Sequence, residues 1–383
     1  MTVAGASARD CDMLVVGGGM AGMSIAALLA EHGRVILLEA EDTPGYHATG
    51  RSVAFWTESY GGPAIQPLTS ASGPMLADPD PALGMAGFLA PRGALHIGPD
   101  KATGDADAFV ALYRGQGVDV RRVDRNAMER AIPGLLPEWT VGVAEPTCQD
   151  IDAAALLAAY RALFLRRGGS LRCGQAFRGA VRDGAGWRVA TAEGEISCAV
   201  LINAAGAWAD EVARLSGVSP IGIAPFRRTV VQLRTDPPVP ADLPLILDLA
   251  ERFYFKSVGA GRLWLTPHDE VPQAPGDASP DDMAVAIAVA RLQQVVGWDI
   301  AAVERKWAGL RSFAPDRAPV YGFDADVPGF FWFAGQGGFG IQTAPAAALI
   351  GAGLALGVTL DSRVAPIKLA AYSPLRFAGR LAR

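Results

Sequence analysis

Three glycines near the start of the chain have the spacing of a nucleotide-binding turn. Gly17, Gly19 and Gly22 follow a short apolar run in the order G-x-G-x-x-G, and Glu39 closes the next apolar run. Gly17 permits a tight turn, Gly19 lets a pyrophosphate approach the backbone, and Gly22 lets a helix and a strand pack closely. Glu39 can accept from a ribose hydroxyl, and an acid there disfavours the 2′-phosphate of NADP. The pattern predicts a site for an adenine dinucleotide; a βαβ unit with a glycine turn and no ligand is the alternative.

Two arginines stand in otherwise apolar segments, where an uncompensated cation would be costly. Arg228 lies within residues 226–233 and Arg311 within residues 306–321. A planar guanidinium binds a carboxylate through two parallel hydrogen bonds, so either arginine could hold a small carboxylic acid. An internal salt bridge is the alternative at each position.

The elements that must position these groups follow from the apolar pattern. Residues 13–16 and 34–38 are predicted to be buried strands on either side of a helix that ends near Ala30. Residues 200–210 repeat this logic, because an apolar strand runs into small residues and then a helix. A further strand at 330–335 leads through the glycines of 336–343 into another helix, whose N-terminus is suited to stabilising negative charge on a bound cofactor.

The loop at residues 43–54 connects the first unit to the rest of the chain. Its glycines, proline and hydroxyl residues could bring hydrogen-bond donors to a pyrophosphate. His47 could be a catalytic base, but we favour a loop histidine at the rim of the cofactor. Phe55 and Tyr60, which follow the loop, either roof a cavity or pack in the core.

Residues 68–145 and 219–305 lose the βαβ rhythm. We expect strands at 226–233, 252–256 and 261–267 to form a curved sheet over the cofactor, with Tyr254 and Lys256 on one face of their strand. Further elements are expected as a strand at 92–98, helices at 109–115, 125–132, 152–168 (capped by Asp152) and 281–296, and strands at 171–177, 187–192 and 195–199.

Composition narrows the class of protein. The chain has 383 residues, of which 50% are hydrophobic and 19% are charged, so two domains with a substantial core are expected. A net charge of −5 with no basic block makes nucleic acid an improbable partner. The four scattered cysteines favour a cytoplasmic protein, and the four histidines lack metal-ligand spacing, so we predict no metal. We predict no signal peptide and no transmembrane segment; a weak peripheral contact with the inner membrane through the apolar run at 344–360 is left open.

Four separated segments resemble one family. The glycine turn with Glu39, residues 48–54, residues 203–210, and residues 307–313 together with 335–343 are similar to the FAD-dependent D-amino-acid oxidase and dehydrogenase family, and within it to the D-arginine/D-amino-acid dehydrogenase branch. The resemblance implies an α/β fold, in which a Rossmann-like FAD-binding domain of the glutathione-reductase type is interleaved with an α+β substrate domain on a mostly antiparallel sheet. The FAD-binding domain would comprise 1–67, 146–218 and 306–383, and the substrate-binding domain 68–145 and 219–305.

The resemblance also implies the ligands of the site. FAD would be held noncovalently, because residues 314–322 lack the cysteine that tethers the flavin in some relatives. The implied cofactor contacts are Gly17, Gly19, Ala21, Gly22, Glu39, Ala40, Ala48, Thr49, Gly50, Arg51, Ser52, Val53, Ala54, Phe55, Phe177, Gly338, Phe339, Gly340, Ile341, Gln342 and Thr343. The implied substrate contacts are Tyr60, Arg228, Tyr254 and Arg311; plain packing is the alternative for each tyrosine.

The implied reaction is oxidative deamination of a D-amino acid, by hydride transfer from Cα to the flavin N5, to an imino acid and then a 2-oxo acid. The strand that resembles the side-chain pocket of the branch offers Ala94 and His96 but no acid, and Phe55 adds an apolar wall. We therefore expect apolar, small or cyclic substrates rather than arginine. A glycine/sarcosine-type amine oxidase or a 2-hydroxy-acid dehydrogenase on the same fold is the alternative; outside enzymes, it is a non-catalytic flavin-binding protein. The electron acceptor is unknown; a quinone or dye is favoured over oxygen, and Lys256 and Lys306 are the only lysines in segments that could reach the flavin.

Overall fold

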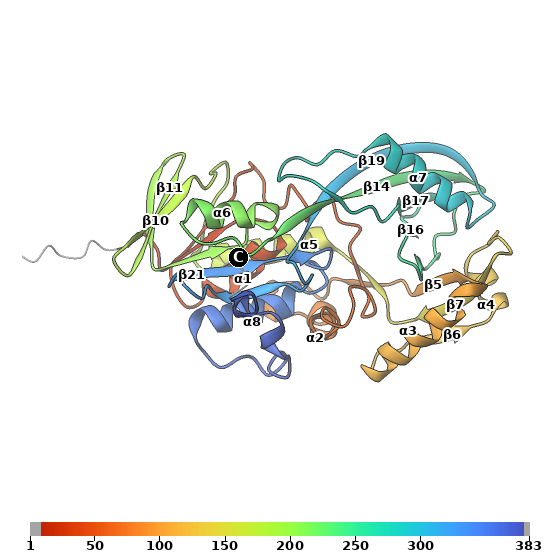
Figure 1. Cartoon of the computed structure of the whole chain (residues 1–383), viewed down its shortest axis with the longest axis horizontal. Coiled ribbons are helices and arrows are strands. Elements are labelled where there is room, and N and C mark those ends of the chain that lie inside the picture. Colours follow the sequence, from red (N-terminus) through yellow and green to blue (C-terminus); the bar gives the residue numbers. More distant parts are fainter. Residues whose placement is uncertain (1–8, 379–383) are drawn as a thin grey trace, which may run out of the picture.

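A computed structural model describes residues 9–378. Residues 1–8 and 379–383, which the predicted FAD-binding domain includes, lie outside the described residues. The molecule is elongated, with a parallel sheet and its helices at one end and a large antiparallel sheet at the other (Figure 1). This is the predicted architecture.

The first sheet has six strands in the order β20-β21-β13-β1-β2-β9. Its strands are β20 (Val320–Phe323), β21 (Phe330–Ala334), β13 (Val200–Asn203), β1 (Met13–Val16), β2 (Val35–Leu38) and β9 (Ser170–Arg172). All neighbours are parallel except β20 and β21. The sheet therefore brings the ends of three sequence-distant strands, β1, β2 and β13, to one edge.

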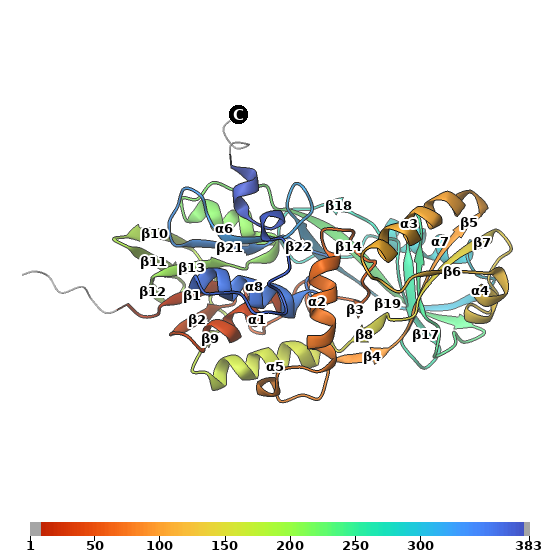
Figure 2. The ribbon, with the colours of Figure 1, turned by 90° about the horizontal axis from the view of Figure 1, so that it is seen from below.

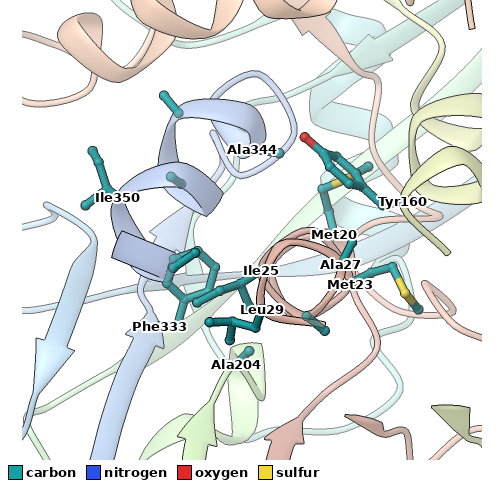
Figure 3. Close-up of a cluster of buried hydrophobic side chains, with 14 of the residues drawn as sticks. Met20, Met23, Ile25, Ala27, Leu29, Tyr160, Ala204, Phe333, Ala344 and Ile350 are labelled. Carbon is teal, nitrogen blue, oxygen red and sulfur yellow. The ribbon is translucent and has the colours of Figure 1, made fainter. Parts of the chain in front are cut away.

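The core at this end lies around helix α1 (Met20–Leu29), which carries no charged residue. Ile25 and Leu29 lie against Phe333 of β21, and helix α8 (Ala344–Leu356) lies alongside (Figure 3). The small residues of α8 permit this approach, because a Cβ at Gly351 would stand 2.5 Å from the Phe333 ring. Helix α5 (Ala153–Arg166) packs against α1 as well, and the Asp152 side chain caps it as predicted.

The turn between β1 and α1 requires its glycines. Gly17 has a φ of +106°, and a Cβ there would stand 2.5 Å from the Ala204 carbonyl oxygen. A Cβ at Gly22 would stand 1.8 Å from the Gly17 carbonyl oxygen. The predicted close packing of helix and strand at Gly22 is confirmed.

The second sheet has ten strands in the order β22-β19-β14-β17-β16-β15-β5-β7-β6, with β18 paired to β14. Its strands are β22 (Gln336–Gly337), β19 (Asp299–Phe313), β14 (Ala224–Asp236), β17 (Arg262–Thr266), β16 (Tyr254–Ser257), β15 (Leu245–Asp248), β5 (Ala94–Pro99), β7 (Trp139–Glu145), β6 (Arg121–Val123) and β18 (Val271–Pro272). Only β15 and β5 pair in parallel. As predicted, Tyr254 and Lys256 share one face, since Phe255 points into the opposite core with Leu265.

Helices and two small sheets complete the molecule (Figure 2). The helices are α2 (Gln66–Ala77), α3 (Thr103–Gly115), α4 (Arg125–Ala131), α6 (Ala209–Leu215) and α7 (Asp282–Gln293). One small sheet joins β3 (Phe55–Trp56), β8 (Gln149–Ile151) and β4 (Leu89–Pro91); the other joins β10 (Gly179–Asp183), β11 (Gly186–Thr191) and β12 (Gly194–Cys198). Within residues 9–378, no helix is both long and apolar enough to cross a membrane.

Some predicted boundaries are displaced. The expected strand at 171–177 ends at Arg172, because Gly174 and Gln175 instead donate to the carbonyls of Glu41 and Glu39. The predicted domain boundary after residue 67 lies inside α2, and the boundary at 306 lies inside β19. The long strands β14 and β19 extend from the antiparallel sheet toward the parallel one (Figure 1), so the division into two domains stays a proposal.

Gly22→Ala tests the packing of the turn. The added methyl group would collide with the Gly17 carbonyl, so we expect a loss of about 1–3 kcal/mol of folding stability and weaker FAD retention. Gly104→Ala in α3 is the matched control, since a Cβ there meets nothing within 4 Å. Denaturant unfolding and bound-flavin absorbance measure both effects; equal behaviour of the two variants would contradict this packing.

Candidate active site

A cavity of about 520 Å³ opens at the carboxyl edge of the parallel sheet. Its walls come from the β1–α1 turn, the end of β2, the loop at 45–53, residues 175–177 and 204–208, the strands β14 and β19, and residues 336–341. This edge is where open α/β sheets bind ligands. The cavity runs between the two sheets, so one elongated ligand can contact both.

One end of the cavity is built around Glu39. Its Oε2 accepts from the Gly18 N–H at 2.7 Å and its Oε1 accepts from the Glu41 N–H at 2.9 Å. These bonds orient the carboxylate at the end of β2. Thr49 Oγ1 accepts from the Met20 N–H at 3.0 Å, so the loop contacts the first turn of α1.

His47 lies at the rim near this end. Its Nε2 is 2.8 Å from Glu41 Oε1, and its ring lies 4.8 Å from the Trp208 ring. Its partners are therefore a neighbouring carboxylate and an aromatic wall. This favours the loop-histidine interpretation over a catalytic base.

The Arg51 guanidinium is occupied by protein groups. It pairs with Asp277 at 2.5 Å and donates to the carbonyls of Ala278 and Ala308 at 3.0 Å. Its side chain holds the segment before α7 across the cavity. The guanidinium of Arg51 is therefore not free to bind the cofactor, and a cofactor contact through the Arg51 backbone stays a prediction.

The end of the loop is fixed in a strained conformation. Ala54 has a φ of +40°, which is unusual for a residue with a Cβ. Lys256 Nζ donates to the Ala54 carbonyl at 3.2 Å and to Asp150 at 2.7 Å, and so secures this position. Lys306 pairs with Asp282 on the surface, and neither lysine lines the cavity.

Arg311 occupies the other end of the cavity, on β19. Its Nη1 donates to the Tyr60 hydroxyl at 2.9 Å and its Nη2 to the Tyr254 hydroxyl at 3.3 Å. Among the described residues, no carboxylate lies within ion-pairing distance of it. Burial would lower the Arg311 pKa, but the two tyrosines raise it above its ordinary value, so the cation is retained. A Cβ at Gly338 would stand 2.5 Å from Nη1, so glycine is needed there.

Arg228, on β14, makes an internal salt bridge and also keeps one donor free for a carboxylate, so both interpretations of the sequence apply to it. Its Nη2 pairs with Glu270 at 2.9 Å and its Nε donates to the Asp269 carbonyl at 2.8 Å, which is an internal salt bridge. Its Nη1 is buried without a partner, and the residue lines the cavity. Burial and the nearby Arg311 lower the Arg228 pKa. One donor thus remains for a ligand.

Aromatic rings enclose the space beside Arg311. Phe55 makes edge contacts with Tyr60 and Tyr254 at 5.1 and 5.4 Å between ring centroids, and Tyr60 lies 5.3 Å from Phe339. The recess lined by Phe55, Tyr60, Tyr254 and Arg311 has a volume of only about 20 Å³. Burial raises the pKa of Tyr254 to about 12, so its hydroxyl keeps its proton.

Most predicted contacts line the cavity or this recess, but four do not. The four are Gly22, Gly50, Phe339 and Thr343. Gly22 serves helix packing, and the Gly50 N–H closes a turn on the Gly45 carbonyl at 2.7 Å. Sequence reasoning missed Trp208 and Gln175, although the small residues before Trp208 did indicate a close approach.

The strand at 93–97 carries no acid, as expected, but the neighbouring strand β7 brings one beside His96. Ala94 pairs with Glu145 across β5 and β7, and the Glu145 carboxylate lies 3.8 Å from His96 Nε2. The pairing of distant strands supplies this acid, which residues 93–97 alone could not reveal. Ser59 and the Glu58 N–H donate to the same carboxylate, and neither His96 nor Glu145 lines the cavity.

His268 is a further residue that sequence reasoning missed. Its Nε2 lies 3.2 Å from the Tyr60 hydroxyl, and its ring lies 5.8 Å from that of Tyr254. Burial, followed by the charges of Arg228 and Arg311, lowers the His268 pKa to about 2. The imidazole is neutral at physiological pH.

A model of the FAD-dependent oxidoreductase (DAO) family matches residues 12–354. The chain belongs to this family. FAD is therefore its cofactor, and the lining fits it, because Glu39, the glycine turn and the start of α1 line one part of the cavity and Gly338 lies beside Arg311. The ribose contact of Glu39 and the pyrophosphate contact of the turn stay predictions. Among the described residues no cysteine lines the cavity, and noncovalent attachment stays a prediction.

Two curated relatives support this membership. Hydrogen cyanide synthase subunit HcnC of Pseudomonas aeruginosa is 28% identical over 277 residues, covering 70% of this chain and 64% of that protein. The chain thus spans slightly less than two thirds of that relative. FAD-dependent oxidoreductase domain-containing protein 1 of Bos taurus is 24% identical over 390 residues, covering 88% of this chain and 79% of that protein.

Solved structures share the fold. Glycine oxidase from Geobacillus kaustophilus superposes with a TM-score of 0.84 at 21% identity, covering 96% of this chain and 99% of that one. L-proline dehydrogenase from P. horikoshii gives 0.82 at 20% identity, covering 96% and 98%. These relatives do not support the D-arginine dehydrogenase branch over others.

The state of His268 predicts a pH dependence of stability. An unfolded histidine titrates near 6.5, whereas the folded pKa is about 2, so the unfolded chain gains a proton first as the pH falls. The stability from neutral His268 is complete above pH 6.5 and is lost as the pH falls from 6.5 toward 2. Relative to His268→Gln, the wild type should lose about 2 kcal/mol between pH 7 and pH 5. Denaturant unfolding of both proteins at the two pH values measures this; a difference independent of pH would contradict it.

Proposed function

We propose that this protein oxidises small amino acids, and that its substrates are D-amino acids with apolar, small or cyclic side chains. The observation that carries the proposal is Arg311, a cation that faces the cavity and has no carboxylate partner within residues 9–378. A bound α-carboxylate would supply the missing negative charge. FAD, when bound, supplies the redox chemistry by accepting a hydride from the substrate Cα.

Each residue around Arg311 would contribute a different contact to substrate binding. Tyr60 and Tyr254 each accept from one terminal nitrogen of Arg311 and so fix the plane of the guanidinium. Arg228 adds its unpartnered Nη1 to the same carboxylate. Orientation of Cα against the cofactor, rather than a strong base, is the main requirement of such a reaction.

The enclosed recess supports the substrate class. The recess has aromatic walls, and two acids near the expected side-chain strand, Glu145 and Asp248, are buried and already bonded. A cationic side chain would find no free carboxylate there.

Anaerobic mixing with a panel of D- and L-amino acids tests the proposal. We expect D-proline, D-methionine or D-phenylalanine to bleach the flavin absorbance and to yield an imino acid, which hydrolyses to a 2-oxo acid and ammonia. Faster bleaching by D-arginine or D-lysine would refute the substrate class. Flavin that no amino acid bleaches would refute the activity.

Oxidation of glycine or sarcosine is the second candidate. The recess of about 20 Å³ favours it, because it leaves little room for a side chain. Including both compounds in the panel decides between the candidates: glycine or sarcosine would then exceed every D-amino acid.

We also propose a quinone or dye as electron acceptor rather than oxygen. A lysine near the flavin assists oxygen in some oxidase relatives, whereas Lys256 here is held by Asp150 and Ala54. Rapid peroxide release with oxygen as the sole acceptor would overturn this.

Arg311→Met should abolish substrate binding while leaving the fold intact. Loss of a buried charged contact is worth about 3 kcal/mol, so kcat/KM should fall roughly 100-fold with the flavin content unchanged. Arg188→Met, at an exposed surface position, is the matched control. A kcat/KM within about threefold of wild type in Arg311→Met would remove the main support for the proposal.

A further inference from the structure

His268 lies behind the active site in a chain of hydrogen bonds. Arg311 donates to the Tyr60 oxygen, and that oxygen lies 3.2 Å from His268 Nε2. Arginine has only donors, so the Tyr60 proton points away from Arg311. It can point toward His268 or toward the ligand space that Tyr60 lines.

The tautomer of His268 decides between these directions. Nε2 is the ring nitrogen that faces the Tyr60 hydroxyl, so its role as donor or acceptor depends on which nitrogen carries the proton. We assign the single proton of the neutral ring to Nδ1. In the neutral ring Nε2 then carries no proton and accepts from the Tyr60 hydroxyl.

The backbone around His268 is built to hold this arrangement. His268 and Glu251 both have left-handed φ values, 56° and 55°, which are uncommon for residues with a side chain. Arg291 of α7 donates to the carbonyls of both Arg252 and Pro267, the residues next to them in the chain. Two positions with left-handed backbone whose chain neighbours are bonded by the same arginine indicate a functional constraint.

The charged groups facing His268 keep the imidazole neutral. They are Arg228 on β14, Arg311 on β19 and Arg291 on α7, with Glu270 bonded to Arg228. Tyr60 and Tyr254 are the titratable groups in ring contact with it. Positive charge on three sides opposes a second ring proton.

We propose that His268 is a positioning residue that holds the Tyr60 proton away from the substrate, so that the Tyr60 oxygen accepts a hydrogen bond from the substrate amino group. The Tyr60 oxygen can accept a second bond besides that from Arg311. Arg311 then fixes the carboxylate and Tyr60 fixes the amine, which together orient Cα. This inference rests on the proposed amino-acid oxidation.

Four variants test the inference in the FAD-loaded protein. His268→Leu removes the acceptor, and His268→Gln keeps one, because its amide oxygen can reach the position of Nε2. Both replacements meet the same left-handed backbone, so they are matched in strain. Tyr60→Phe and the double variant Tyr60→Phe/His268→Leu show whether His268 acts through Tyr60.

Two readouts separate positioning from folding. The limiting rate of anaerobic flavin reduction by D-proline should fall about tenfold in His268→Leu and stay within about threefold of wild type in His268→Gln. The Kd of acetate, which has a carboxylate but no amine, should change less than about threefold in both, as followed by the flavin spectrum. In the Tyr60→Phe background, His268→Leu should have no further effect.

Each other outcome contradicts the inference. A His268→Leu rate equal to wild type, a loss that persists in the Tyr60→Phe background, or acetate binding that weakens with the rate would each exclude this role. If wild-type flavin is not reduced by D-proline or any other amino acid, the proposed function fails and this inference fails with it. If D-proline reduces the flavin of the wild type and of His268→Leu at the same rate, the inference is wrong and the proposed function stands.

Discussion

The rest of the site depends on one constraint, a cation in the cavity wall whose side-chain partners in the described part of the chain are two tyrosine hydroxyls. Arg311 is bonded by Tyr60 and Tyr254, and neither offers a full negative charge. Burial opposes a guanidinium in such a setting, and the two tyrosines more than offset that effect on its pKa. The strand β19 delivers Arg311 there, and Gly338 leaves room for it. Under the proposed function, the carboxylate of the substrate supplies the negative charge at this position.

The two ends of the cavity are lined by different kinds of groups. At the Glu39 end, the lining consists of the glycine turn and one carboxylate, which we predict to bind the nucleotide part of FAD. At the Arg311 end, recognition depends on side chains carried by β14, β16 and β19 of the antiparallel sheet. The cavity is lined by residues of both sheets, so one elongated cofactor can contact both.

The sequence predicted what is local and missed what depends on distant pairing. The glycine turn, Glu39 and the strand–helix–strand unit lie within 30 residues of one another, so spacing alone identified them, and the isolated cation at Arg311 was visible from its apolar neighbours. The salt bridge of Arg228 with Glu270, the carboxylate of Glu145 beside His96, and the contact of His268 with Tyr60 join segments that only the folded sheet brings together. The predicted boundary at 306 lies within β19, which the sequence could not show because the strand pairs along its length with the distant β14.

The most direct test of the central claim compares two ligands that differ only in the group Arg311 would bind. D-Proline and D-prolinamide have the same ring and amine, but the amide lacks the negative charge. Under anaerobic conditions, D-proline should bleach the flavin, and D-prolinamide at the same concentration should leave it oxidised. Reduction of the flavin at equal rates by the two compounds would contradict a carboxylate bound at Arg311.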